Sequence, residues 1–420
     1  VVIVLAALSF LWAFYTRSRV GIFFGVMSVV ALAVYRGIPQ GVIWNGRVVP
    51  YWFVSIYLAS AWFIGDLFVH VYERRHERRL IDWHRWQLYY EEEGLHEQMV
   101  APPVRPHRIW SAVSIAVISV ALVVAPSSPG ISNLLAITTT GNQVSYWASW
   151  NYSGYQAKPA WGEYHTLINT LQHEATTHGC GRAMWEYNSD QNRFGTPMAL
   201  MILPMWTNGC IGSMEGLTFE SSPMVPYHFM VQSELSKDPS RPQVGLPYGD
   251  LNVNLGIEHL QLEGVKYFVA YSHPVVSAAD ANPNLVHLAT TPIVGDQGVR
   301  WHIYRVKYAP LVTGLAMTPN VVAGVASRTT WLDVNSLWWI TPSQWSTYIA
   351  ASGPDSWPHV ASTAAIVHHR EPYVRVSRIR NDGDRVSFHV DRLGVPVLVK
   401  IPYYPRWHAS GATGPYRVSP

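Results

Sequence analysis

Charged residues are scarce in this chain of 420 residues. Asp, Glu, Lys and Arg together make up 14% of it, against roughly 25% in an ordinary soluble domain. Hydrophobic residues make up 49%. This balance excludes a disordered chain, a coiled coil and a plain soluble enzyme. It favours a membrane protein with a sizeable part in water.

A dominant sign of charge is also lacking. Thirty Lys and Arg stand against 27 Asp and Glu, and the formal net charge of +3 is dispersed along the chain. We therefore expect no nucleic-acid partner. Aromatic residues, in contrast, are abundant, with 19 Trp and 23 Tyr. Such rings are used at membrane interfaces and on sugar-binding surfaces.

The common catalytic and metal-binding motifs are missing. His173 and His178 are five residues apart, so the pair at i and i+4 that places two zinc ligands on one helix face is absent. No Walker motif, dinucleotide-binding glycine fingerprint or G-x-S-x-G nucleophile elbow occurs. We therefore expect no metal site, and no cofactor is evident.

Four apolar segments in the first third predict membrane spans, at residues 1–15, 20–35, 50–72 and 109–125. The third is about long enough to cross a hydrocarbon core of ~30 Å at 1.5 Å per residue. A signal peptide is the alternative for the first segment, but three spans follow it and no small-residue cleavage site is present. Because the chain begins inside an apolar run and stops without a plausible terminus, we expect a fragment of a longer protein.

Arginines predict the orientation of the membrane region, residues 1–126. The loop 73–108 contains seven of them, whereas the loop 36–49 contains two. The positive-inside rule then places the loop 73–108 in the cytoplasm and everything after residue 125 outside. Within that loop, residues 80–90 predict an amphipathic helix on the inner leaflet, with a solvated charged helix as the alternative. We expect a multi-pass protein of the cell membrane with a large domain outside the cytoplasm.

The outer part predicts two kinds of structure. In residues 127–366 helices and strands alternate, which indicates an α/β domain; the expected helices are 164–176, 252–263 and 336–351, and the expected strands 182–187, 265–271 and 299–308. Residues 367–420 contain the strand-like runs 373–379, 385–390 and 395–401, with a turn signal at 381–384. The expected fold is a membrane α-helical bundle, an extracytoplasmic α/β domain and a truncated antiparallel β module.

Both cysteines of the chain, Cys180 and Cys210, lie in this outer part. Two cysteines in an oxidising compartment predict a disulfide. Closing the loop between them would stabilise the fold by roughly 3–4 kcal/mol. Free buried thiols are the alternative.

Rings and carboxylates are concentrated between residues 184 and 227. The best candidates for binding a substrate there are Trp185, Glu186, Trp206, Glu215 and Glu220. Rings stack on the C–H faces of sugars while carboxylates bind hydroxyl groups, and two carboxylates about 5–10 Å apart could also serve acid–base chemistry. The alternative is that these residues build a Trp-rich core.

A second group of candidates lies in the short loop between the second and third spans, at Trp44, Asn45 and Arg47. An arginine at the outer interface could bind a lipid phosphate. Anchoring of the topology is an equally good interpretation.

Several segments carry a family resemblance. They include W-N-G-R-V-V-P-Y-W at residues 44–52, C-G-R-A-M-W-E-Y at 180–187, S-M-E-G at 213–216 and Y-Y-P-R-W at 403–407. These segments resemble the large actinobacterial polytopic membrane proteins called 6-pyruvoyl-tetrahydropterin-synthase-related. Those proteins are in turn similar to YfhO-like members of the GT-C glycosyltransferase superfamily.

The resemblance implies a glycosyltransferase that uses a polyprenyl-phosphate-linked sugar at the outer face of the membrane, in cell-envelope glycan assembly. The alternative is a non-catalytic membrane protein whose outer domain binds envelope glycan or a protein partner. The acidic catalytic residue of the superfamily usually lies in the first outer loop, which would precede Val1. No catalytic residue can therefore be assigned in this chain, and any divalent metal would belong to that preceding part.

Overall fold

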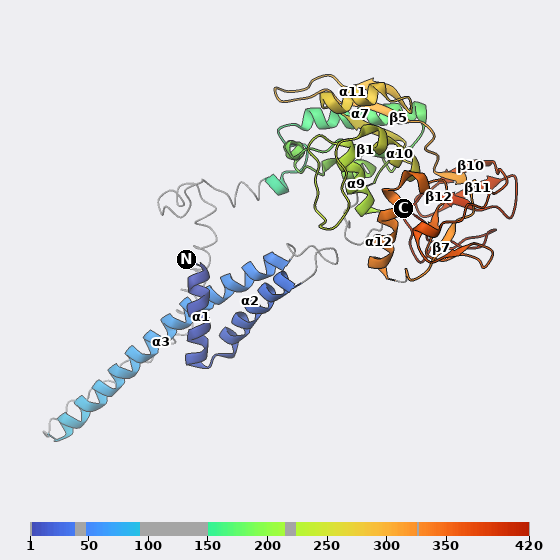
Figure 1. Cartoon of the computed structure of the whole chain (residues 1–420). Coiled ribbons are helices and arrows are strands. Elements are labelled where there is room, and N and C mark those ends of the chain that lie inside the picture. The colour runs from blue at the N-terminus through green and yellow to red at the C-terminus, as the bar shows by residue number, and fades with distance from the viewer. Residues whose placement is uncertain (1, 38–47, 93–149, 215–223, 326, 420) are drawn as a thin grey trace. The chain divides into compact units, whose positions relative to one another are not determined.

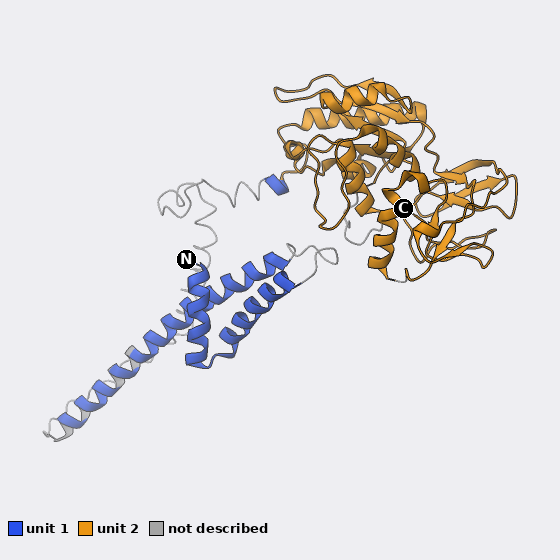
Figure 2. Ribbon diagram, viewed as in Figure 1, with its two compact units in different colours: residues 1–152 blue, residues 153–420 orange. Residues whose placement is uncertain are grey.

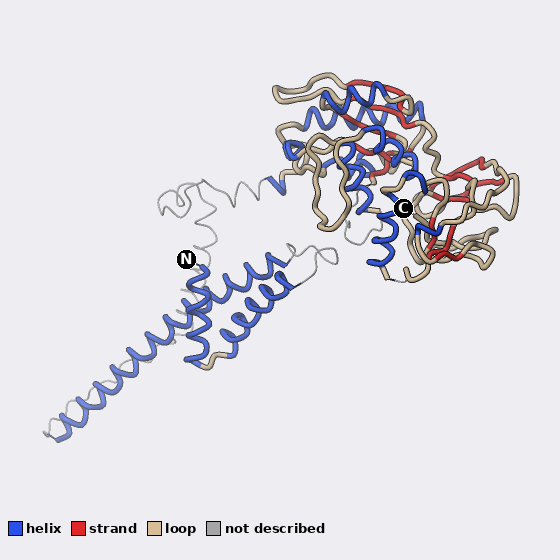
Figure 3. The backbone as a smooth tube through the Cα atoms, in the orientation of Figure 1, coloured by secondary structure: helices blue, strands red, loops and turns tan. Residues whose placement is uncertain are grey.

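The structure, a computed structural model, describes residues 2–37, 48–92, 150–214, 224–325 and 327–419 (Figure 1). The chain divides into two compact units, residues 1–152 and 153–420 (Figure 2). The described part of the first unit is helical, whereas the second contains helices and strands (Figure 3).

Three helices make up the described core of the first unit: α1 (Val2–Thr16), α2 (Arg19–Gly37) and α3 (Val49–Glu92). Among the described residues, two segments are long and apolar enough to cross a membrane, namely Arg19–Gly37 and Val49–Arg74. They match the second and third predicted spans. The first predicted span forms a helix of only 15 residues, shorter than the roughly 20 that cross a bilayer unaided. The fourth, residues 109–125, lies outside the described residues.

The third helix differs from the prediction at its charged end. We expected a span that ends at residue 72 and a separate amphipathic helix at 80–90, but α3 runs without interruption for 44 residues. No glycine or proline occurs between residues 73 and 92, so nothing in the sequence breaks the helix. The remainder of the predicted cytoplasmic loop, residues 93–108, lies outside the described residues.

Small residues let these helices pack closely. A Cβ atom at Gly25 would collide with the ring of Phe10 in α1, and one at Gly21 with the ring of Trp62 in α3. This G-x-x-x-G spacing is typical of packed helices in membranes. Between α1 and α3, Trp12 Nε1 donates a hydrogen bond to Asp66 Oδ2 at 2.8 Å.

A five-stranded mixed sheet forms the centre of the second unit, in the order β2-β1-β3-β5-β4. Its strands are β1 (Gly181–Trp185), β2 (Ile211–Ser213), β3 (Tyr267–Ala270), β4 (Leu285–Thr290) and β5 (His302–Val306). β1 pairs in parallel with both β2 and β3, while β5 pairs in antiparallel fashion with β3 and β4. The predicted α/β layer is therefore present.

Both faces of the sheet are buried, because alternate residues of the inner strands enter two different hydrophobic clusters. Ala183, Trp185 and Tyr267 belong to the cluster that includes α7 (Trp161–His178), whereas Met184 and Phe268 belong to the opposite one. The opposite cluster also receives side chains from α9 (Val225–Leu235), α10 (Val253–Glu263) and α11 (His273–Ala281). A parallel strand buried on both faces has a nearly continuous apolar sequence.

The helix boundaries predicted from the sequence agree with the structure at α10 and differ from it at α12. Asn252 caps the start of α10 through its side chain, and Gly264 ends it in the left-handed conformation (φ 67°), as a C-terminal glycine does. α12 spans Arg328–Trp339 rather than the expected 336–351. A capping box between Ser327 and Thr330 starts it.

The C-terminal segment is joined to the rest of the second unit. Its strands are β10 (Val376–Asn381), β11 (Val386–Val390) and β12 (Val397–Val399). β10 and β11 form the predicted antiparallel hairpin. β12 pairs instead with β6 (Val312–Gly314), which precedes residue 367 in the chain. A further small parallel sheet contains β7 (Asn320–Val322), β8 (Ile349–Ala350) and β9 (His359–Val360).

A partly buried cation connects these parts. The guanidinium of Arg182, in β1, donates hydrogen bonds to the carbonyl oxygen of Glu263 and to that of Lys400, the latter at 2.6 Å. The ammonium of Lys400 in turn donates to the carbonyl oxygen of Gln261 at 2.6 Å. Both cations thus satisfy carbonyl groups in the last turn of α10, where positive charge is favoured by the helix dipole.

Glu263 makes the stability of this network depend on pH. Burial raises the pKa of its carboxyl group from 4.5 to about 7, and the charges of Arg182 and Lys400 only partly offset this. Between these two pKa values the unfolded chain has lost a proton that the folded chain keeps, so stability falls as pH rises. Glu263→Gln should abolish this slope in thermal unfolding experiments from about pH 4.5 to 7.5.

The control is Glu258→Gln, which changes an exposed glutamate on the same helix and should preserve the slope. An unchanged slope in Glu263→Gln would show that Glu263 titrates normally in the folded protein.

Candidate saccharide-binding surface

Trp185, one of the expected ring residues, lies in the core. It is the last residue of β1 and is 1% exposed. It packs in the same cluster as Leu171, Phe194 and Trp301. A ring in this position stabilises the sheet and presents no face on which a sugar could stack.

Glu186 follows Trp185 at the carboxyl end of β1 and is also buried. Its Oε2 accepts hydrogen bonds from the backbone N–H groups of Tyr271 and Ser272, both at 2.9 Å. Those groups lie between β3 and α11, so the carboxylate bridges the ends of two neighbouring parallel strands. Its Oε1 is buried and has no hydrogen-bond partner within the described part of the chain.

The carboxyl ends of β1 and β3 are where α/β sheets of this strand order usually bind ligands, because the chain leaves the two strands in opposite directions. Burial raises the pKa of Tyr271 at this edge, and the charge of Glu186 raises it further. The side chains of Asn188 and Asp238 meet nearby through a hydrogen bond of 3.2 Å. The Glu186 carboxylate thus lies at the edge of the sheet where such folds usually bind a ligand, and it is hydrogen-bonded to the backbone there.

Trp206 has a different environment. It ends the short helix α8 (Leu203–Trp206) and is partly exposed. Its ring lies 5.6 Å from that of Trp161 and 6.2 Å from that of Tyr155, both also partly exposed. Its Nε1 donates a hydrogen bond to the hydroxyl of buried Tyr164 at 3.1 Å. We call Tyr155, Trp161 and Trp206 the ring cluster.

Polar side chains continue this surface along α7. The ring of His165 stacks on that of Trp161, with centroids 5.0 Å apart, and Asn169 lies one turn further on, within 3.4 Å of His165. Residues 161, 165 and 169 share one face of the helix because they are four positions apart. His165 and Asn169 are exposed, so donors and acceptors for hydroxyl groups lie beside the rings.

A buried ion pair holds the first turn of α7 in place under the ring cluster. Arg193 donates two hydrogen bonds to the carboxylate of Glu163, at 2.8 and 3.1 Å. Trp301 Nε1 donates a third to the same carboxylate at 2.8 Å. This geometry fixes Glu163 and therefore the helix turn that contains Trp161.

Sequence reasoning missed Trp161, Tyr155 and His165. The signal was present, because Trp161, His165 and Asn169 recur at intervals of four residues, but the helix was expected to begin only at residue 164. The other candidates, Trp44, Asn45, Arg47, Glu215 and Glu220, lie outside the described residues. In the sequence, Glu215 is the second residue after the end of β2.

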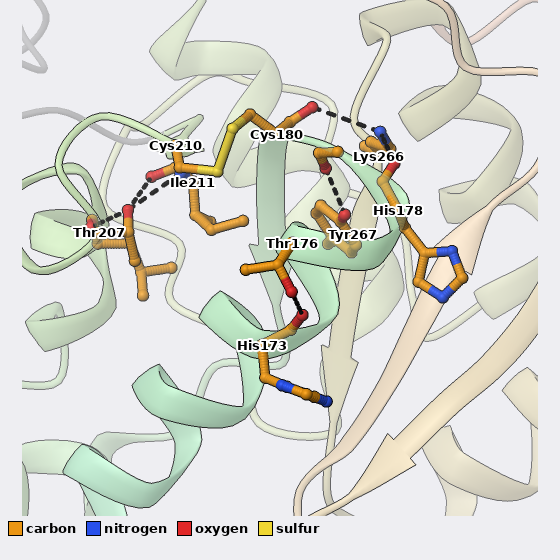
Figure 4. The surroundings of a disulfide bond; sticks show 11 residues. His173, Thr176, His178, Cys180, Thr207, Cys210, Ile211, Lys266 and Tyr267 are labelled. Carbon is orange, nitrogen blue, oxygen red and sulfur yellow. Dashed lines mark hydrogen bonds between the residues drawn. A yellow bond between two sulfur atoms is a disulfide. The ribbon is translucent and has the colours of Figure 1, made fainter.

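The predicted disulfide is present between Cys180 and Cys210 (Figure 4). Cys180 immediately precedes β1 and Cys210 immediately precedes β2, so the bond joins the amino ends of two paired strands. Lys266 and Tyr267 of the β3 region also contact this end, and the hydroxyl of Tyr267 donates to the carbonyl of Gly179 at 2.6 Å. The disulfide therefore lies at the end of the sheet opposite to Glu186.

The comparisons leave the family resemblance untested. No protein-family model, curated protein or solved structure matches the chain. Among the described residues, no group of three or more His, Cys, Asp or Glu side chains could hold a metal ion.

Glu186→Gln should lower the stability of the fold and leave saccharide binding unchanged. The substitution replaces charge-assisted hydrogen bonds by neutral ones and buries an amide NH₂ group, so we expect a loss of about 1–3 kcal/mol. Chemical denaturation measures the loss. Asp190→Asn removes an exposed carboxylate from the same edge and should be neutral. Wild-type stability combined with lost binding would assign Glu186 to a binding site instead.

Proposed function

We propose that this chain is part of an integral membrane protein whose second unit, residues 153–420, binds saccharide outside the cytoplasm. The observation that carries the proposal is the ring cluster with its adjacent polar groups. Partly exposed aromatic rings beside donors and acceptors are the pattern by which proteins bind sugars, since one side of the ligand is apolar and its rim is polar.

The exposed surface of the first unit supports the membrane part of the proposal. Large apolar side chains point outward from all three helices, such as Leu11 in α1, Phe23 in α2 and Phe68 in α3. In water such a surface would be a large apolar patch of the kind that soluble proteins avoid. In a bilayer it would be the lipid-facing surface.

Binding is better supported than transfer. Glu186 is the one described candidate carboxylate, and it is engaged by the backbone rather than open to a substrate. The proposed ligand is the envelope glycan that the family resemblance implies. Glycosyl transfer from a polyprenyl-phosphate-linked sugar, which the same resemblance implies, stays a prediction.

Trp161→Ala and Trp206→Ala should each weaken saccharide binding about tenfold, since a stacked ring contributes roughly 0.5–1.5 kcal/mol beyond its buried area. An array of bacterial envelope oligosaccharides would select a ligand, and calorimetric titration of the purified full chain would give the affinities. Trp357→Ala provides the matched control, because Trp357 is also partly exposed in the second unit. Wild-type affinity in both ring-cluster variants would refute the binding site.

Topology is tested separately, by labelling intact cells with a membrane-impermeant maleimide. Asp382→Cys, at the exposed turn between β10 and β11, should react before lysis, whereas Glu77→Cys in α3 should react only after it. The two native cysteines are joined in a disulfide and do not interfere. Labelling of Asp382→Cys only after lysis would contradict the proposed orientation.

A further inference from the structure

The positive charge of the chain is concentrated near its C-terminal end. Residues 367–420 contain nine Lys and Arg against four Asp and Glu, whereas residues 1–366 contain 21 against 23. The charge is therefore less dispersed than the sequence analysis concluded, because a net charge of +3 for the whole chain conceals a basic segment. Such an asymmetry points to an anionic partner.

Most of these basic side chains are in solvent. Seven arginines of the segment are exposed: Arg370, Arg375, Arg378, Arg380, Arg385, Arg392 and Arg406. Within the described parts of the chain, none of the seven forms an ion pair with a carboxylate. Their charge is thus not neutralised by the fold.

The hairpin of β10 and β11, which we call the arginine ribbon, gathers three of them. It lies at the margin of the second unit (Figure 1). A bulge interrupts its pairing between Ser377 and Arg380, and Arg378 within the bulge has a positive φ of 52°. A bulge re-aims the side chains that it contains. A shallow hollow results, lined by Arg378, Ile379, Arg380, Ser387, Phe388 and His389.

Exposed apolar side chains accompany the arginines. At the open end of the ribbon, the backbone of Arg375 is hydrogen-bonded to Asp391, and Arg392 and Leu393 follow. Leu393 is 85% exposed and Tyr373, two residues before Arg375, is 83% exposed. Burying side chains as open to water as these against a partner would be favourable.

We propose that the arginine ribbon and its open end bind the anionic headgroup surface of a lipid bilayer. Guanidinium groups bind phosphate oxygens, and neighbouring leucine and tyrosine side chains can enter the headgroup region. This combination of charges with open apolar side chains favours a bilayer over a soluble polyanion, for which arginines alone would suffice. The inference rests on the membrane part of the proposed function and is independent of the ring cluster.

The test uses the full chain in lipid nanodiscs, with an environment-sensitive NBD dye attached to Ser387→Cys in the hollow. We expect the emission to shift to the blue in phosphatidylglycerol discs and to remain unshifted in phosphatidylcholine discs. Arg375→Gln with Arg380→Gln should weaken the contact about tenfold or more, since each basic residue near an anionic surface contributes roughly fivefold. The contact should also weaken in 0.5 M salt.

Lys237→Gln with Arg300→Gln is the matched control, because it removes two exposed basic residues elsewhere in the second unit and should preserve the shift. Leu393→Ser should reduce it without changing the net charge. Incorporation of the chain into neutral discs tests the membrane anchor separately. If the chain enters the discs and the dye responds equally to both lipids, the inference is wrong. A response to soluble polyphosphate but not to phosphatidylglycerol discs would also overturn it.

Discussion

The hydrogen bonds of the partly buried Arg182 guanidinium connect the main parts of the second unit. Arg182 lies in β1, and it donates hydrogen bonds to the end of α10 and to the segment that follows β12. These three elements are separated by up to 218 residues in the sequence. Removing a guanidinium group from water is costly unless its N–H groups are hydrogen-bonded. The fold must therefore bring the carbonyl groups of Glu263 and Lys400 within reach of Arg182. The sheet and the C-terminal segment therefore form one unit rather than two independent modules.

The tryptophans have two different roles. Within the described parts of the chain, five are almost fully buried: Trp185, Trp301, Trp331, Trp338 and Trp339. Much of the aromatic content that suggested interfaces and sugars therefore builds the two cores. Trp161 and Trp206 differ because they are only partly buried, although both rings contact that of Tyr164. Residue type alone therefore does not separate the surface rings from the core rings.

The sequence was informative where local signals were strong. The apolar periodicity and Gly264 predicted the position of α10. The residues Asn381 to Asp384 predicted the turn of the hairpin. The short strands β7, β8 and β9, of two or three residues, are too short to show a period. The start of α12 was predicted at residue 336 because apolar residues follow that position. The helix instead begins at Arg328, after the capping box at Ser327.

The role of Glu186 could not be predicted from the sequence, because its partners are 85 and 86 residues away. A carboxylate beside a tryptophan is compatible with catalysis, sugar binding or a structural role, and its hydrogen bonds to the backbone just before α11 favour the structural role. The position of Glu186 also bears on where this sheet could bind a ligand. In doubly wound α/β sheets the carboxyl ends of the strands at this position face the ligand, but here the Glu186 carboxylate accepts hydrogen bonds from the backbone at this edge. The two proposed binding surfaces, the ring cluster and the arginine ribbon, are formed by other residues of the second unit.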